Sequence, residues 1–175
     1  MKKNIKDLLL GGLFSVGGYI LMKGKLMQYF NGSERAGQWF HVDDFLISHD
    51  FPQIKNYRLT PYQFSNLLKL TEKLNVLVSK YGLPKITSGG RPREVGDFVT
   101  ALRKRGYSPA SPSAHDEFAA VDLTWGPEKN KLVHEDAKKI GFLQNILYKD
   151  GSFLHLAIKE DGRELPYISK TMEKY

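Results

Sequence analysis

The longest regular pattern of apolar and polar positions lies between residues 60 and 81. Thr60, Pro61 and Gln63 form a typical helix start, with a capping threonine, a proline at the first position and the glutamine of a capping box. Gly82 and Pro84 are typical of a helix end. The pattern predicts an amphipathic helix with its apolar face in the core. The apolar positions at helical spacing are Phe64, Leu67, Leu68, Leu74, Leu77, Val78 and Tyr81.

The rest of the pattern alternates between short apolar runs and a second helical stretch. Runs at residues 85–88, 121–125 and 152–159 predict strands. Residues 40–46 predict one short turn of helix, and residues 94–104 have a mixed pattern that fits a helix. We therefore expect an α+β domain with a small, mainly antiparallel sheet and flanking helices. A second amphipathic helix is expected from Leu132, Val133, Ala137, Ile140, Leu143, Ile146 and Leu147.

The first thirty residues differ from the rest of the chain. A basic start, residues 1–6, precedes an uncharged run from Leu8 to Met22 that Lys23 and Lys25 close. The run is shorter than the ~20 residues of a membrane-spanning helix. Its basic flank is typical of a signal peptide, although no small-residue cleavage site follows. Four roles fit this segment: an export signal, an uncleaved anchor, a helix buried against a partner protein, or an arm packed on its own domain. We expect residues 1–30 to serve export, anchoring or assembly.

The polar, glycine-bearing residues 31–38 predict a linker. The folded domain is therefore expected to span residues 39–175. Hydrophobic residues make up 41% of the 175 and charged residues 26%, as in ordinary globular proteins. The chain has no cysteine, which excludes disulfides and thiolate metal ligands.

The chain is basic, with a formal net charge of +7. The charge is dispersed, apart from a short run at residues 103–105. The sequence has no RNA-binding or helix-turn-helix motif, so we expect no nucleic-acid partner. An anionic membrane surface, an anionic wall polymer and a merely solvated basic surface are the alternatives.

The most informative chemistry lies between residues 113 and 122. His115 and Asp122 stand seven residues apart, and His155 follows inside the last predicted strand. Two imidazoles and a carboxylate are the ligand set of an open zinc site, whose fourth position holds a water. Because a metal-bound water is a nucleophile at neutral pH, this set predicts a hydrolase. The other histidines (His41, His49 and His134) are expected to be structural or on the surface, and the tryptophans (Trp39 and Trp125) to be core anchors.

Three motifs resemble, in the same order, those of the M15 family of zinc D,D- and L,D-peptidases. That family includes phage endolysins and shares its fold with the hedgehog amino-terminal domain. The family pattern is Ser-Gly-Tyr-Arg, then Ser-x-His-x-x-Gly-x-Ala-x-Asp, then aromatic-x-His-x-Asp. The resemblance covers about residues 39–160. The matching residues are Ser88, Gly89 and Arg91; Ser113, His115, Ala120 and Asp122; and Phe153 and His155.

The resemblance implies zinc held by His115, Asp122 and His155. It implies that Arg91 binds a substrate carboxylate. It also implies that Ser113 supports the loop that carries the metal ligand His115 and takes part in substrate binding. The implied substrates are peptidoglycan stem peptides, cut next to a D-residue. Such an enzyme acts outside the cytoplasm, secreted or anchored in the cell envelope, or on a phage particle.

The chain departs from the family pattern at three positions. Phe118 replaces the glycine of the second motif, and Ala157 replaces the acid that follows the last histidine. Ser152 stands where many members have a carboxylate base. Asp150, five residues before His155, is the candidate general base. Asp116 and Glu117 are further candidates.

Two functions therefore stay open at this point. The first is a zinc-dependent peptidoglycan peptidase. The second is a catalytically inactive M15-like domain that serves as a structural or wall-binding component of a phage virion or similar assembly. In either case residues 1–30 are expected to contact membrane or virion partners.

Overall fold

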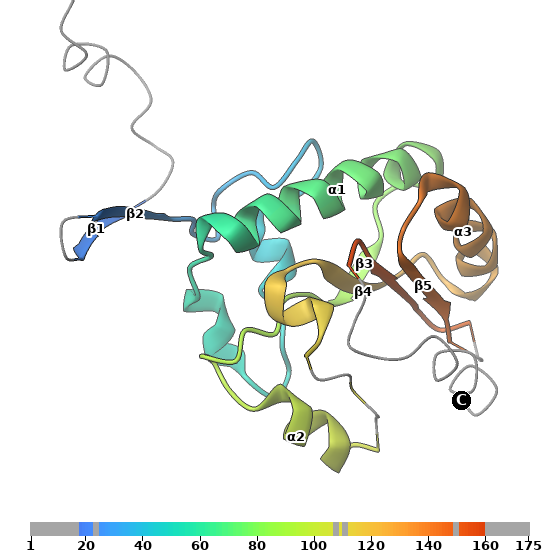
Figure 1. The fold of residues 1–175 in the computed structure, drawn as a ribbon. Coiled ribbons are helices and arrows are strands. Elements are labelled where there is room, and N and C mark those ends of the chain that lie inside the picture. Colours follow the sequence, from blue (N-terminus) through green and yellow to red (C-terminus); the bar gives the residue numbers. More distant parts are fainter. Residues whose placement is uncertain (1–17, 23–24, 107–108, 110–111, 149–150, 160–175) are drawn as a thin grey trace, which may run out of the picture.

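A four-stranded antiparallel sheet forms the centre of the domain, in the strand order β3-β4-β6-β5 (Figure 1). The computed structural model describes residues 18–22, 25–106, 109, 112–148 and 151–159. Together with the helices around the sheet, this arrangement confirms the predicted α+β class. The strands are β3 (Lys85–Ser88), β4 (Ala120–Thr124), β5 (Gln144–Leu147) and β6 (Leu154–Ala157).

The predicted long helix is α1, Pro61–Tyr81. Its capping box is present: Thr60 accepts a hydrogen bond from the Gln63 backbone, and the Gln63 side chain accepts one from the Thr60 backbone. The helix ends at Gly82, whose backbone has a φ of 83°. Residues with a side chain rarely adopt this conformation. Local sequence signals at both ends therefore fix its length.

The predicted second amphipathic helix is wrong beyond residue 140. Helix α3 spans Pro127–Ile140, and Gly141 then adopts a left-handed conformation with a φ of 82°. The remaining apolar positions, up to residue 147, lie in a turn and in β5, which pairs with β6. The apolar positions beyond Gly141 keep a helical spacing by chance. Residues 144–147 form a strand because they pair with β6.

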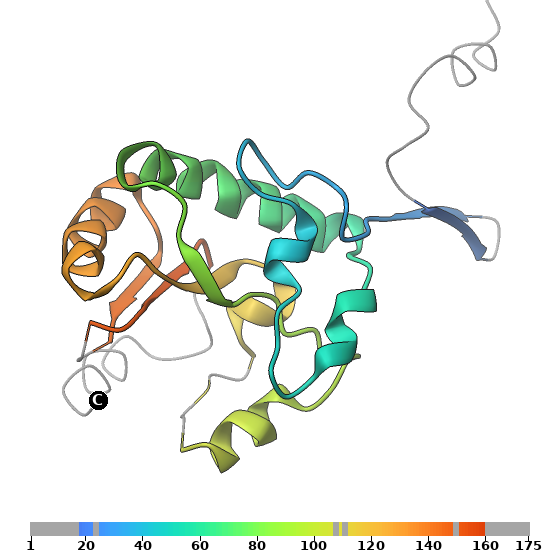
Figure 2. The same ribbon diagram turned by 180° about the vertical axis from the view of Figure 1, so that it is seen from behind.

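The shorter helices also follow local signals. Helix α2, Phe98–Lys104, forms the second half of the stretch predicted at residues 94–104, and Asp97 caps it by accepting a hydrogen bond from the Thr100 backbone. Seen from behind in Figure 2, α2 lies at the opposite end of the domain from α1 and α3. Within the described ranges there are also short 3-10 helices: η2 (Val42–Phe45), η3 (Pro52–Asn56) and η4 (Ala114–Glu117).

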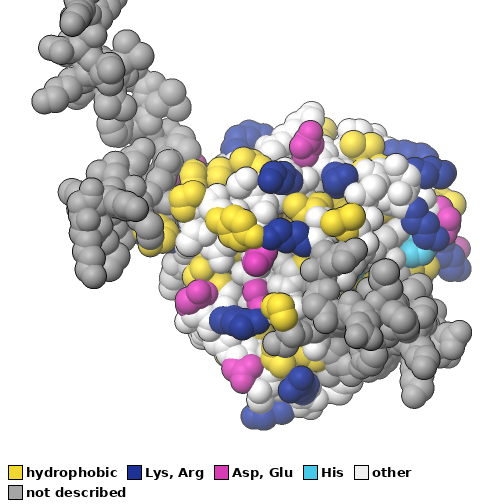
Figure 3. All heavy atoms as spheres, viewed as in Figure 1, with side chains coloured by type: hydrophobic (Ala, Val, Ile, Leu, Met, Phe, Trp, Pro, Cys, Tyr) yellow, Lys and Arg dark blue, Asp and Glu magenta, His cyan; other side chains and the backbone are white. Residues whose placement is uncertain are grey.

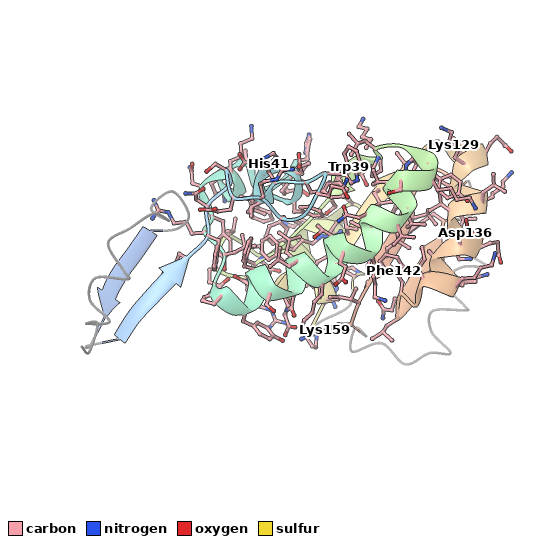
Figure 4. The ribbon with its side chains drawn as sticks, turned by 90° about the horizontal axis from the view of Figure 1, so that it is seen from above. Trp39, His41, Lys129, Asp136, Phe142 and Lys159 are labelled. Atoms are coloured by element: carbon pink, nitrogen blue, oxygen red, sulfur yellow. The ribbon has the colours of Figure 1, made fainter. Side chains whose placement is uncertain are left out.

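The hydrophobic core joins the inner face of α1 to one face of the sheet. In β4 and β6, residues of this core alternate with residues of the opposite face, which include Asp122 and His155. Trp125 packs against this core, as predicted, but Trp39 is 44% exposed and lies at the surface in Figure 4. The prediction that Trp39 anchors the core was therefore wrong. The central core residues include Leu67, Leu70, Leu74, Leu77, Val121, Leu123, Leu154 and Leu156.

Part of the N-terminal segment forms a hairpin of β1 (Gly18–Met22) and β2 (Lys25–Tyr29). The last residues of the apolar run are thus in a strand, while residues 1–17 lie outside the described part of the chain. In the expected linker, residues 31–38, Ala36 is fully buried in the core. In the described part of the chain, none of the helices has both the length and the hydrophobicity of a membrane span.

Candidate metal centre

A row of polar residues crosses one face of the sheet. Asp122 in β4 lies opposite Ser88 in β3 on one side and opposite His155 in β6 on the other. The neighbours of Asp122 along its strand, Val121 and Leu123, point into the core. Asp122 therefore points to the other face, together with its cross-strand partners.

His115 reaches the same place from η4, just before β4. Ser113 caps this short helix and accepts a hydrogen bond from the His115 backbone N, so it supports the ligand loop. The His115 carbonyl accepts a hydrogen bond of 2.9 Å from the Arg91 backbone N. These contacts tie the loop to the segment that follows β3.

The structure brings the three predicted ligands together. The Asp122 Oδ1 atom lies 2.9 Å from Nδ1 of His155 and 3.4 Å from Nε2 of His115. The two histidine nitrogens are 3.2 Å apart. Ligand atoms bound tetrahedrally to zinc lie about 3.3 Å from one another, given zinc–ligand distances of ~2.0–2.1 Å. The spacing therefore fits a small tetrahedral ion, and this buried group can bind a metal ion.

Both imidazole rings are oriented from behind by oxygen atoms. The Nδ1 atom of His115 is 2.7 Å from the Gly89 carbonyl, and Nε2 of His155 is 3.2 Å from Oε1 of Gln144. A proton on each of these outer nitrogens donates to its oxygen and leaves the lone pair of the inner nitrogen directed at the centre. Gln144 could not be identified from the sequence, because the register of β5 against β6 is not visible there.

Arg91 is bound to the other oxygen of Asp122. Its Nη2 atom lies 2.5 Å from Asp122 Oδ2, and Nε and Nη2 both donate to the Ser88 hydroxyl at 3.1 and 3.0 Å. The guanidinium is nearly buried. Oδ1 of the carboxylate is left facing the two histidines.

Charge and burial together set the protonation states of the site. Burial alone raises the pKa of Asp122, but its interactions with His115 and with the Arg91 guanidinium outweigh burial and hold the pKa well below its usual value. Burial lowers the pKa of His115, and the Arg91 charge adds to this effect. An ionised carboxylate and a neutral imidazole are the forms that bind metals.

The segment Gly89–Gly90 passes through a narrow space. A Cβ atom on Gly89 would lie 2.0 Å from the Phe45 carbonyl oxygen, and one on Gly90 would lie 2.2 Å from the ring of Phe118. Glycine is required here because both neighbours are too close for a side chain. The approach also places the Gly89 carbonyl behind His115.

Phe118, at the position of the motif's glycine, keeps a left-handed backbone, with φ 57° and ψ 30°. This conformation is uncommon for a residue with a side chain. Its ring is buried and stacks on Tyr57, with the ring centres 6.0 Å apart. The aromatic side chain therefore belongs to the core.

Two of the acidic residues considered for proton transfer are bound elsewhere. Asp116 pairs with Arg93 at 3.0 Å, and Glu117 pairs with Lys159 at 2.5 Å. Asp150 lies outside the described residues. Ala157, at the position of the family's acid, is fully buried.

The remaining histidines lie apart from this centre. His41 and His49 are exposed, as predicted for surface residues. His134 is buried on α3, where its Nδ1 atom is 2.9 Å from Oδ1 of Asn145.

A scan against protein-family models found no match, and searches of curated proteins and of solved structures also found none. The resemblance to the M15 peptidases therefore stays a prediction, carried by the motifs and the residues around the candidate metal centre.

Proposed function

We propose that this chain is a zinc-dependent peptidase of the M15 type that cleaves peptidoglycan stem peptides next to a D-residue. The observation that supports it is the convergence of His115 Nε2, Asp122 Oδ1 and His155 Nδ1, with both rings oriented by oxygen atoms behind them. Zinc is the proposed metal because nitrogen and carboxylate ligands at tetrahedral spacing suit it.

Three protein ligands favour a catalytic site over a closed structural one. Structural zinc sites usually have four protein ligands, whereas catalytic sites have three and an open position. The metal-binding group among the described residues consists of His115, Asp122 and His155. A zinc ion held there would lower the pKa of a bound water and polarise a substrate carbonyl.

The chain's own residues would keep this centre in its binding form. Arg91 holds one oxygen of Asp122 and keeps the carboxylate ionised, while the Gly89 carbonyl keeps His115 oriented. The proposed proton acceptor is Asp150, assigned from its sequence position before His155.

The test combines zinc content with hydrolysis of purified peptidoglycan. Protein purified without chelator should contain about one zinc per chain, as an open single-metal site predicts. Digestion products, separated and identified by mass spectrometry, should show cleavage at a D-residue. His155→Ala should abolish both zinc and cleavage, whereas His134→Ala, which changes a buried histidine away from the centre, should keep both.

A second candidate function is a non-catalytic domain that binds the cell wall or forms part of a phage virion. It is favoured by the engagement of Asp116 and Glu117 in ion pairs and by Ala157 at the family's acid position. In that case the protein would bind zinc and sediment with intact peptidoglycan, yet release no fragments. Asp150→Asn separates the two functions, because only in an enzyme that uses Asp150 would it abolish cleavage while zinc stays bound.

The proposed location is outside the cytoplasm, in the cell envelope or on a phage particle, with residues 1–30 as the export, anchoring or assembly segment. The dispersed positive charge suits an anionic wall. Figure 3 shows Lys and Arg side chains scattered over one face, and several on α3 pair with acidic neighbours. Fractionation of expressing cells tests the location: recovery of the full chain only in the cytoplasmic fraction would contradict the envelope proposal.

A further inference from the structure

Gln144 lies beside the His155 ring, on the side opposite the metal-binding nitrogen. Its Oε1 atom is 3.2 Å from Nε2 of His155, and the two residues are only 5% and 6% exposed. His155 is opposite Ile146 in the β5–β6 pair, and Gln144 lies two residues along β5. Residues two apart on a strand share one face, so the contact follows from the register of two paired strands.

The chemistry of this contact suits a metal ligand that binds through Nδ1. A neutral imidazole has one protonated nitrogen and one with a free lone pair. An amide oxygen beside Nε2 accepts a hydrogen bond from the Nε2 proton. The lone pair of Nδ1 is then directed at the metal position. Because the amide is uncharged, it orients the ring without adding a second negative charge beside Asp122.

We propose that Gln144 is a positioning residue of the metal centre, whose side-chain oxygen holds the His155 ring with Nδ1 toward the metal. This inference rests on the zinc site of the proposed function and adds a partner that supports a ligand without touching the metal. Partners of this kind typically change metal affinity by about 10–100-fold when they are removed.

Gln144 is also the partner that mutation can test most directly. His115 is oriented by the Gly89 backbone carbonyl, which no substitution removes. His155 is oriented by the Gln144 side chain on the neighbouring strand β5. A substitution can remove this side chain's oxygen or give it a negative charge.

The chain offers a matched control at the next residue. Asn145 in β5 makes the same kind of contact with a different histidine: its Oδ1 atom is 2.9 Å from Nδ1 of His134 on α3. Adjacent strand residues point to opposite faces, so a change at Asn145 perturbs β5 without reaching the metal centre.

The experiment compares wild type, Gln144→Leu, Gln144→Glu and Asn145→Leu in the full chain, by zinc competition against a chelator. We expect zinc affinity about 10–100-fold lower in Gln144→Leu. Affinity should be retained or higher in Gln144→Glu, which keeps an oxygen acceptor, and unchanged in Asn145→Leu. Equal losses in both Gln144 variants would overturn the proposal, because the acceptor would then be irrelevant.

A spectroscopic signal provides a second readout. In the zinc-loaded wild type, the His155 Nε2 proton should exchange slowly with water and give a low-field NMR signal. In Gln144→Leu that signal should move upfield or vanish by exchange. An unchanged signal and unchanged affinity in Gln144→Leu would overturn the role of Gln144 alone. A wild type that binds zinc but cleaves no peptidoglycan would instead overturn the proposed peptidase, and one that binds no zinc would overturn both.

Discussion

The ring of Phe118 occupies the space that a side chain on Gly90 would need, since a Cβ atom there would lie 2.2 Å from Cε1 of the ring. This chain has glycine at 90 and phenylalanine at 118. A side chain at residue 90 and the Phe118 ring therefore compete for the same space.

This shared space predicts strong coupling between residues 90 and 118. Gly90→Tyr alone should be destabilising because its side chain collides with the Phe118 ring. Phe118→Gly alone should also be destabilising, because removing a buried aromatic costs about 3–5 kcal/mol, while relief of the left-handed backbone returns only ~1–2 kcal/mol. The double variant should be more stable than the sum of the single changes by ~0.5–3 kcal/mol.

Urea unfolding of the four proteins measures this coupling directly. If the two changes in the free energy of unfolding are strictly additive, the side chains at residues 90 and 118 do not compete for one space. The zinc content of each folded variant should stay near that of the wild type, because neither residue is a ligand.

A second prediction concerns Arg91, which the resemblance assigns to substrate binding. In the structure its guanidinium pairs with Asp122, and both side chains are nearly buried. Arg91→Met should destabilise the metal-free protein by about 3–5 kcal/mol, because it leaves a buried carboxylate without its partner. Zinc should then stabilise the variant more than it stabilises the wild type, since the ion supplies the missing positive charge.

Arg93→Met is the matched control for Arg91. Arg93 is largely exposed and pairs with Asp116 at 3.0 Å, so its loss should change the free energy of unfolding by ~0–1 kcal/mol. Equal stability losses for the two arginine variants would contradict a supporting role for Arg91 at the metal centre.

A third prediction is that zinc stabilises the folded protein. Zinc at 100 times its dissociation constant should raise the free energy of unfolding by about 2.7 kcal/mol, provided that the unfolded chain does not bind it. The increase should disappear in His155→Ala and persist in His134→Ala. Thermal unfolding with and without zinc checks this, and equal zinc responses of the two histidine variants would place the metal elsewhere.

A fourth prediction concerns acid stability and Asp136, which lies on α3 in Figure 4. Hydrogen bonds from Lys80 and Tyr81 on α1 hold the pKa of Asp136 well below its usual value. A lowered folded-state pKa gives stability at neutral pH that is lost as the pH falls below the unfolded value of about 3.9.

Asp136→Asn should therefore be less stable than the wild type at pH 7, and the difference should shrink below about pH 4. Salt should also reduce the difference, because the contact is near the surface. Glu128→Gln, which removes an exposed partner of Lys131 on the same helix, should have little effect. A difference that is constant from pH 7 to pH 3 would indicate a contribution from packing alone.

Elements whose signals are local could be predicted from the amino-acid sequence. Thr60 and Gln63 predict the start of α1 and Gly82 its end, because capping and backbone preference act within a few residues. The sequence also provided the three metal-ligand candidates, because two imidazoles and a carboxylate are the ligand set of an open zinc site.

How these residues come together depends on contacts between distant elements of the fold. Residues 144–147 continue a helical pattern but form a strand, because pairing with β6 outweighs local preference. The β5–β6 register also places Gln144 behind His155, and the β4–β6 register places Asp122 opposite His155. The fold brings the Phe118 ring against Gly90. These relationships join residues far apart in the chain, and their geometry depends on strand register and packing, which no short stretch of sequence encodes.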